Sequence, residues 1–379
     1  MKKRGFYFFF AALGFLFNFT AALACTDIQV RASDGSNIIA RSMEFSVDMQ
    51  SNLRTSTQGR VFNTTAPNGK AGLAWQAKYG YVYLDAFNLD VALDGMNETG
   101  LSVENLYLPG YAEYQTVPVG KDKQALPYLN FADWVLGNFK SVDEVKSALA
   151  QIYVYAQAIT VPGHGNVVFP LHFAIHDASG KGIVVEYLKG KLNIYDYMGV
   201  MTNSPGYQWH LDNLQNYIHL APINPPAVKV NGITYEVNGV GFGMIGLPGD
   251  VSPPSRFVKM ATLLHVAFPV NNANSALNLA QHIINNVDIP LGLVREPSQG
   301  DATNETTQWV VFKDLNNKIF YYRTYGDLTL RSVSLNKLSF SPNAARLKMP
   351  IARAQYVDDL TGQFMQTGIS DATQMAMRK

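Results

Sequence analysis

A single cysteine, Cys25, constrains this chain more than any other residue. It follows a leader in which a basic start, residues 2–4, precedes an apolar run over 5–17 and a small-residue end at 22–24. This is the layout of a secretory signal peptide with an A-x-A cleavage site. An exported chain with one cysteine forms no internal disulfide bond, so its stability must come from the packing of its core.

Cleavage after Ala24 would make Cys25 the first residue of the mature chain. A thiolate is a strong nucleophile, and a free α-amino group has a pKa of about 7.7–8.0. An N-terminal cysteine therefore carries its own general base close to its sulfur, and no histidine is needed. The order of leader, cleavage site and cysteine predicts an N-terminal nucleophile.

Three other interpretations of this start are open. In the first, the leader is an uncleaved membrane anchor; its apolar run is shorter than the roughly 20 residues of a membrane span, and Asn18 and Thr20 interrupt it. In the second, Cys25 carries a lipid, although Ala22 stands where such sites usually have leucine. In the third, Cys25 is a small buried hydrophobic residue, which its place at a cleavage site argues against.

Composition limits the partners of the mature chain. The full chain has 30 basic and 29 acidic residues, and the leader removes three basic ones, which leaves 27 against 29. This balance predicts binding neither to nucleic acid nor to an anionic membrane surface. We expect a cleaved leader at 1–24, a folded domain at 25–353 and a polar tail at 354–379, with the mature protein in the periplasm or outside the cell.

The first mature residues are expected to form a β-hairpin. Polar and apolar residues alternate after Cys25, and Asp34-Gly35 is a turn signal. If these two residues form the whole loop, Cys25 lies opposite Glu44. Arg41 then falls on the other face under strict alternation, so the strand must bulge or bend if both charged side chains point at Cys25. On spacing alone, a solvated pair at a strand end is the better interpretation of the two.

The remaining pattern alternates between blocks of strands and blocks of helices. Strands are expected within 71–87, 101–108, 167–176, 183–188, 191–198 and 309–324, and helices within 124–150, 208–218, 252–267 and 273–287. Ser141 fits the first position of a capping box, and residues 229–251 are Gly-rich and irregular. This order predicts an α+β or layered fold, not an alternating βαβ one.

Motifs for phosphate, dinucleotide or zinc binding do not occur in the sequence. His172 and His176 are four residues apart, but in a strand-like stretch with no third ligand in view. We therefore interpret them as core or surface histidines, not as a metal site. Neither a cofactor nor a metal is expected.

Ordered blocks from Cys25 to about Ser332 resemble the choloylglycine hydrolase family, which contains bile salt hydrolases and penicillin V acylases. The blocks are Cys25-Thr26, Arg41-Ser42-Met43-Glu44, Met96-Asn97-Glu98-Thr99-Gly100-Leu101, Leu106-Tyr107-Leu108-Pro109-Gly110-Tyr111, Ile183-Val184-Val185-Glu186, Thr202-Asn203-Ser204-Pro205, Leu247 to Phe257, Thr324-Tyr325-Gly326-Asp327 and Arg331-Ser332. Each block is a weak signal, whereas their joint order behind an N-terminal cysteine is specific.

The resemblance implies a fold and a chemistry. The fold is the four-layer αββα sandwich of N-terminal nucleophile hydrolases, with two antiparallel sheets flanked by helices. The reaction is hydrolysis of a non-peptide C–N bond in a linear amide through a thioester. By position, Cys25 is the nucleophile with its α-amine as base, and Arg41 lies beside the sulfur and favours the thiolate.

The resemblance also assigns four supporting residues. Glu44 occupies the place of an aspartate that holds the α-amine, and its side chain is one methylene longer than that of aspartate. The side-chain amide of Asn203 and the backbone N–H of Tyr107 are the oxyanion donors, and Arg256 completes the charged cluster. From the residues alone, Asn203 is a turn residue before Ser-Pro and Arg256 is a first-turn helix residue. Phe45 stands where a tryptophan is common, which leaves an apolar but smaller pocket wall.

The expected substrate is a small amide with an apolar acyl group. Tyr107 favours a penicillin V acylase-like enzyme, since bile salt hydrolases often have asparagine at this position. Hydrolysis of conjugated bile salts or of N-acyl homoserine lactones are the alternatives. A lipid-anchored binding protein acylated at Cys25 and a histidine-assisted cysteine protease are hypotheses from other classes. The short apolar run of the leader predicts no stable membrane anchor, and the resemblance suggests a homotetramer.

Overall fold

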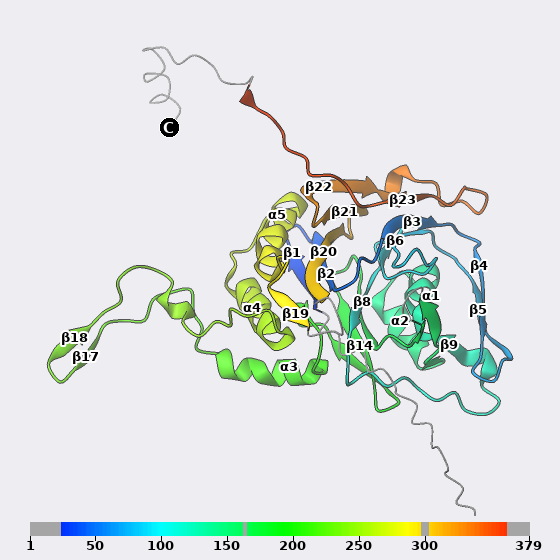
Figure 1. Cartoon of the computed structure of the whole chain (residues 1–379), viewed down its shortest axis with the longest axis horizontal. Coiled ribbons are helices and arrows are strands. Elements are labelled where there is room, and N and C mark those ends of the chain that lie inside the picture. The colour runs from blue at the N-terminus through cyan, green and yellow to red at the C-terminus, as the bar shows by residue number, and fades with distance from the viewer. Residues whose placement is uncertain (1–23, 162–164, 297–302, 362–379) are drawn as a thin grey trace, which may run out of the picture.

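Two antiparallel β-sheets lie face to face at the centre of the protein (Figure 1). The computed structural model describes residues 24–161, 165–296 and 303–361. The leader up to residue 23 and the end of the polar tail from 362 lie outside the described residues. Among the residues that are described, no helix is both long and apolar enough to cross a membrane.

The first sheet contains the N-terminal hairpin. Its strands run in the order β16 (Val200–Met201), β1 (Cys25–Arg31), β2 (Asn37–Phe45), β20 (Thr303–Asp314), β21 (Ile319–Thr324) and β22 (Asp327–Ser334), and β19 (Val294–Glu296) also pairs with β20. Helices α4 (Pro253–Val266) and α5 (Ala273–Ile284) pack on this sheet.

The second sheet has eight strands. Their order is β15 (Lys191–Asp196), β14 (Gly182–Leu188), β13 (Leu171–His176), β8 (Ser102–Tyr107), β7 (Asp94–Asn97), β6 (Tyr81–Leu84), β3 (Asn52–Ser56) and β23 (Lys348–Pro350). Helix α1 (Phe131–Asn138) packs on β7 and β8, and α2 (Val142–Leu149) follows it. The side-chain oxygen of Ser141 accepts a hydrogen bond from the Glu144 N–H, so the predicted N-cap is confirmed.

Helices outside and sheets inside make four layers, which confirms the predicted αββα sandwich. One apolar core lies between the sheets and under α4 and α5, and a second lies between the eight-stranded sheet and α1. The smaller elements are helix α3 (Tyr207–Asn213) and the ribbons β4–β5 (Val61–Thr65, Ala71–Gln76), β9–β10 (Ala125–Pro127, Tyr153–Tyr155), β11–β12 (Ile159–Val161, Gly165–Val167) and β17–β18 (Val228–Val230, Ile233–Tyr235).

The N-terminal hairpin is present, but its predicted register is wrong by one residue. Cys25 pairs with Met43, not with Glu44. Ala32 N–H donates to the Ser36 carbonyl at 2.9 Å, so the loop has three residues and ends at Gly35, whose φ is +90°. Three-residue loops that end in a left-handed glycine are a common hairpin type, and an Asp-Gly pair fits them as well as the two-residue loop.

The corrected register changes which side chains share a face. Arg41 pairs with Asp27, two residues along from Cys25, so Arg41 and Cys25 point to the same side without any bend in β2. Glu44 takes the opposite side. An irregularity does occur here, but on β20, where Gln308 is the extra residue between the pairs that Met43 and Glu44 make.

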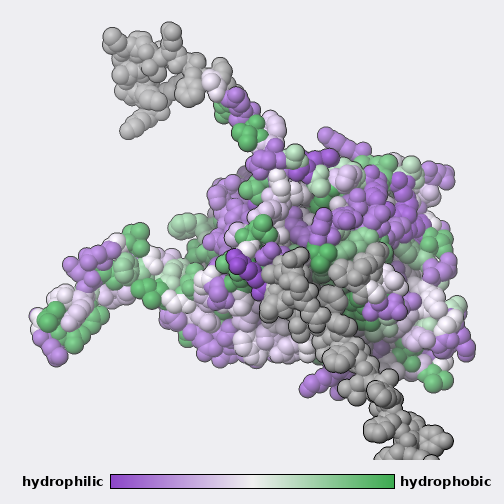
Figure 2. Space-filling model, in the orientation of Figure 1, coloured by the Kyte–Doolittle hydropathy of each residue, from purple (hydrophilic) through white to green (hydrophobic). Residues whose placement is uncertain are grey.

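An arm formed by residues 218–246 stands away from the sandwich between α3 and α4, with β17 and β18 at its tip (Figure 1). The sequence predicted an irregular stretch at 229–251, and the short ribbon inside it was not predicted. Apolar side chains are exposed along the arm (Figure 2), among them Ile218, Ile223, Val228, Ile233, Val240 and Ile245.

Candidate active site

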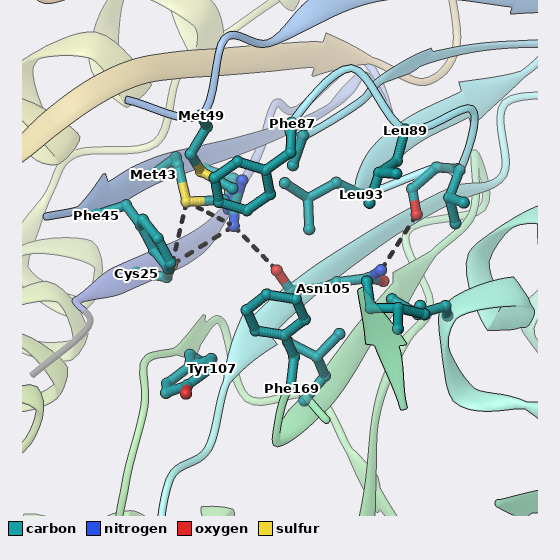
Figure 3. A pocket seen from close by; sticks show the side chains of 17 residues that line it. Cys25, Met43, Phe45, Met49, Phe87, Leu89, Leu93, Asn105, Tyr107 and Phe169 are labelled. Carbon is teal, nitrogen blue, oxygen red and sulfur yellow. Dashed lines mark hydrogen bonds between the residues drawn. The ribbon is translucent and has the colours of Figure 1, made fainter. Parts of the chain in front are cut away.

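Cys25 begins β1 and is 3% exposed. Its Sγ lies 3.4 Å from Nη2 of Arg41 and 3.8 Å from Sδ of Met43 (Figure 3). Burial raises the pKa of the Cys25 thiol, and the Arg41 guanidinium is the largest effect in the opposite direction. Arg41 thus lies beside the sulfur, where the resemblance placed it, and favours the thiolate against the effect of burial.

Arg41 is itself held in place from two sides. Its Nη2 donates to the backbone carbonyl of Asn105 at 2.9 Å, and its guanidinium carbon lies 4.6 Å from the ring centroid of Trp309. The first contact comes from β8 of the second sheet and the second from β20 of the first. The cation beside the thiol is therefore fixed between the two sheets.

The backbone nitrogen of Cys25 is bound by a side chain far along the chain. It donates to Oδ1 of Asn203 at 2.7 Å. Nη2 of Arg256 donates to the same oxygen at 2.6 Å, while Nη1 reaches the Cys25 carbonyl and Oγ1 of Thr26, each at 2.6 Å. Arg256 lies on the first turn of α4 and is fully buried. The fold thus brings together Cys25, Asn203 and Arg256, as the resemblance implied.

The amide of Asn203 also contacts the end of β8. Its Nδ2 donates to the Tyr107 carbonyl at 2.8 Å, and since a side-chain amide carries two N–H bonds, the second can serve a developing oxyanion. Tyr107 therefore neighbours Asn203. The oxyanion role of its N–H stays a prediction.

Glu44 lies on the other face of β2 from the thiol. Its carboxyl accepts from Oγ1 of Thr307 at 2.8 Å, and its backbone N–H donates to the Ala24 carbonyl at 3.0 Å. The Ala24 N–H in turn donates to the carboxyl of Glu305. The structure retains the Ala24–Cys25 peptide bond, so the contact of Glu44 with a free α-amine stays a prediction.

An apolar cavity opens beside Cys25. Its walls are made by the rings of Phe45, Phe87 and Phe169 and by Met43 and Met49 (Figure 3). The cavity is partly open, and its volume of about 70 Å³ is smaller than the roughly 150 Å³ of an apolar cavity that holds benzene. A ligand must therefore be slim, or must displace side chains in order to enter.

A family model for linear amide C–N hydrolases of the choloylglycine hydrolase family matches residues 25–349. The chain belongs to this family. The bile salt hydrolase/transferase of Clostridium perfringens is 33% identical over 325 residues, which cover 84% of this chain and 94% of that protein. A penicillin V acylase of Pectobacterium atrosepticum is 28% identical over 344 residues, 86% of this chain and 85% of that protein.

Solved structures agree with this membership. A variant of the conjugated bile acid hydrolase from Clostridium perfringens superposes with a TM-score of 0.76 and 29% identity, over 89% of this chain and all of that one. The penicillin V acylase of Agrobacterium tumefaciens superposes with a TM-score of 0.68 and 25% identity, over 86% of this chain and 91% of that one. This member of the family is thus a linear amide C–N hydrolase with the N-terminal nucleophile fold.

Sequence reasoning missed several contacts of the hydrolase site. Asn105 binds Arg41 through its backbone carbonyl, which every residue type possesses, so the sequence does not indicate this contact. Glu305 and Thr307 lie on the first half of β20, a strand that the sequence pattern placed from Trp309 onward. Residues 303–308 are polar throughout, so no alternation of apolar residues in the sequence marks this half of the strand.

The buried carboxyl of Glu44 gives a pH-dependent prediction. Burial raises the pKa of Glu44 from its ordinary 4.5 to about 8, against opposing effects of Arg256 and Thr307. The folded chain that retains Ala24 then keeps a proton that the unfolded chain releases, so its stability falls as pH rises from about 4.5 to about 8.

Glu44→Gln should remove this slope. We expect urea unfolding to show that the free energy of unfolding of the variant, relative to that of the wild type, is higher at pH 8 than at pH 5 by more than about 1 kcal/mol. One pKa unit corresponds to about 1.4 kcal/mol. Equal slopes for the two proteins would contradict the assignment.

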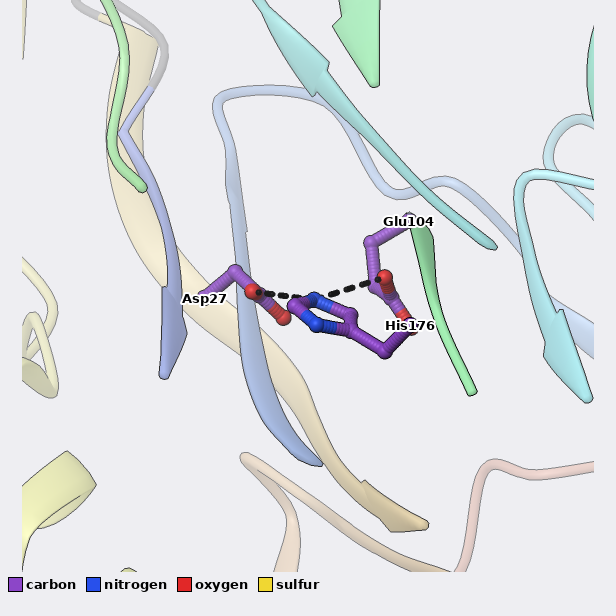
Figure 4. A group of neighbouring side chains, drawn as sticks. All are labelled: Asp27, Glu104 and His176. Carbon is purple, nitrogen blue, oxygen red and sulfur yellow. Dashed lines mark hydrogen bonds and ion pairs between the residues drawn. The ribbon is translucent and has the colours of Figure 1, made fainter. Parts of the chain in front are cut away.

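His172 and His176 are both buried, as core histidines are, and the expected absence of a metal stays a prediction. His176 is held between the carboxylates of Asp27 and Glu104, at 3.1 and 3.5 Å from its Nε2 (Figure 4). These three side chains form a group with the donor types of a metal site. However, the ammonium of Lys313 already binds Glu104 and, at 2.6 Å, Asp94, so a cation is supplied by the protein itself.

Proposed function

We propose that this hydrolase is exported, is cleaved between Ala24 and Cys25, and uses the freed N-terminal cysteine to hydrolyse an amide with an apolar acyl group. The observation that carries this proposal is the convergence of four groups. The thiol of Cys25, the guanidinium of Arg41, the Cys25 nitrogen and the amide of Asn203 meet at an apolar cavity.

The proposed reaction has two steps. The thiolate of Cys25 attacks the amide carbonyl, and the oxyanion is stabilised by Nδ2 of Asn203 and the N–H of Tyr107. The α-amine, which has taken the thiol proton, passes it to the leaving amine as the C–N bond breaks. Water then attacks the thioester, the α-amine accepts its proton, and the acid leaves as the thiolate is restored.

The cavity supports a slim acyl group. Its walls are apolar and aromatic, which suits an aryloxyacetyl or linear acyl chain, and a four-ring steroid would have to displace more of the wall side chains than a single ring would. We therefore propose a penicillin V acylase-like specificity. Hydrolysis of conjugated bile salts is the second candidate, supported by the 33% identity to a bile salt hydrolase/transferase.

A substrate panel tests the specificity. With equal amounts of purified enzyme, kcat/KM for penicillin V should exceed that for glycocholate and taurocholate by at least about tenfold, a ratio that pocket fit alone can supply. N-acyl homoserine lactones with linear chains complete the panel. A preference for the bile salts would overturn the proposed specificity in favour of the second candidate.

The start of the mature chain decides between hydrolase and anchored binding protein. Intact mass and N-terminal sequencing of protein from an exporting host should give a chain that begins at an unmodified Cys25. A diacylglycerol on the Cys25 sulfur would block the proposed nucleophile, and an acyl chain on its α-amine would block the proposed base; either would support the lipid-anchored alternative.

We also propose that the chain self-associates through its arm. A two-stranded ribbon is marginally stable alone in water. The side chains of Val228 and Ile233 on the arm are exposed, and burial against an apolar partner would stabilise them. Replacing both by lysine should shift the protein to a smaller species in sedimentation velocity. Val119→Lys, at a fully exposed valine elsewhere on the surface, is the matched control and should leave the assembly unchanged.

A further inference from the structure

Two buried histidines flank the segment that carries Asn203. His172 lies on β13 and His210 on α3, and each is 1% exposed. Nε2 of His172 lies 2.9 Å from the Thr202 carbonyl, and Nε2 of His210 lies 2.8 Å from the Asn203 carbonyl. The two peptide groups on either side of the Asn203 α-carbon are therefore bound from two different elements.

The proton of His210 can be placed from its surroundings. Its Nε2 faces a carbonyl, so that nitrogen carries the hydrogen, while its buried Nδ1 has no hydrogen-bond partner among the described residues. The ring stacks on Phe257, with centroids 4.7 Å apart and planes 10° from parallel. Burial lowers the pKa of His210 to about 4, so the neutral ring is a permanent donor near neutral pH.

His172 contacts a second buried group through its other ring nitrogen. Its Nδ1 lies 3.0 Å from Oε1 of Glu186. Because the Thr202 carbonyl can only accept, the hydrogen bond between them places a hydrogen on Nε2 of His172. Glu186 also accepts from the Tyr207 N–H at 2.9 and 3.1 Å through its two oxygens. One buried carboxyl thus links β14, β13 and the start of α3, the helix that carries His210.

We propose that His172 and His210 are positioning residues for the hydrolysis, which set the direction of the Asn203 amide by binding the carbonyls before and after it. With both flanking peptide planes fixed, the Asn203 side chain is held at the Cys25 nitrogen and the Tyr107 carbonyl. Neither histidine touches the thiol. This inference rests on the proposed oxyanion role of Asn203.

The test uses two substitutions at one position. His210→Phe keeps a ring to stack on Phe257 but removes the donor, whereas His210→Gln restores an N–H. With the panel's fastest substrate, His210→Phe should lower kcat about 10–100-fold, the range expected from a misplacement of about 1 Å, with little change in KM. His210→Gln should recover most of this loss.

A second readout separates positioning from general loosening. Alkylation of Cys25 by iodoacetamide needs the thiolate but develops no oxyanion, so His210→Phe should react at the wild-type rate. His176→Gln is the matched control, because it changes a buried histidine that does not touch the Thr202–Asn203 segment, and it should keep the wild-type ratio of hydrolysis to alkylation. If His210→Phe does not fold, His172→Phe makes the same test from β13.

Two results would overturn the inference: wild-type kcat in His210→Phe, or a parallel loss of hydrolysis and alkylation. Asn203→Ala distinguishes this failure from that of the proposed function. If Asn203→Ala loses roughly 10²–10³-fold in kcat, as removal of an oxyanion donor does, and His210→Phe loses nothing, only the positioning role is wrong. If Asn203→Ala retains kcat, the proposed oxyanion site itself is wrong.

Discussion

Replacing Cys25 by alanine should abolish amide hydrolysis, with a loss in kcat of at least about 10⁴-fold, because the side chain that forms the thioester is removed. The folded structure should persist, since Cys25 contributes only a small side chain to the core. Hydrolysis of the best panel substrate and the urea unfolding curve measure the two effects. Turnover retained in Cys25→Ala would contradict the mechanism directly.

The base can be tested separately from the thiol. A chain that keeps Ala24 in front of Cys25 retains the thiol beside Arg41 but has an amide in place of the α-amine. Such a chain should be inactive in hydrolysis while Cys25 still reacts with iodoacetamide. A histidine-assisted cysteine protease would behave differently, because its base does not depend on a free N-terminus, and activity in this chain would favour that class.

Met43→Leu is the matched control for both experiments. Met43 pairs with Cys25 across the hairpin and lines the same cavity, and leucine conserves its apolar character and much of its volume. This variant should hydrolyse the same substrates in the same order of preference. A loss as large as that of Cys25→Ala would show that packing around the thiol, not the thiol, limits the reaction.

The sequence was sufficient for the parts of the site that depend on residue type and order. Cys25 and Arg41 lie together because strand alternation places them on one face, and this follows once the hairpin register is known. The register itself depends on whether the loop has two residues or three, and Asp34-Gly35 fits both. A one-residue choice therefore decided which of Arg41 and Glu44 faces the thiol.

The other parts of the site depend on contacts between residues far apart in the sequence, which local patterns do not predict. Asn203 and Arg256 were assigned through the resemblance alone, because a turn residue before Ser-Pro and a first-turn arginine carry no local sign that they meet at Cys25. The histidine contacts to the Thr202 and Asn203 carbonyls involve main-chain acceptors, which every residue possesses. Such contacts arise when the two sheets stack, and the hydrophobic periodicity of the sequence does not predict them.

Lys313 illustrates the same limit in the core. On β20, a lysine beside an aspartate, Asp314, is typical of a solvent-facing strand position. In the structure Lys313 is fully buried between the sheets, and its ammonium binds Asp94 and Glu104. Burial disfavours the ammonium, but the two carboxylates outweigh this effect and raise the pKa of Lys313, so it is charged at working pH.

Lys313→Met should therefore destabilise the protein by about 3–5 kcal/mol, the usual effect of removing one partner of a buried ion pair. Methionine approximates the length of the lysine side chain, but it leaves Asp94 and Glu104 buried beside each other without their cation. Urea unfolding at pH 7 measures the change. Lys181→Met is the matched control, since Lys181 pairs with Asp143 on the surface, where exposed pairs contribute about 0–1 kcal/mol. A loss below 1 kcal/mol in Lys313→Met would mean that the two carboxylates are protonated or solvated in the folded chain, and that the buried ammonium does not hold the sheets together.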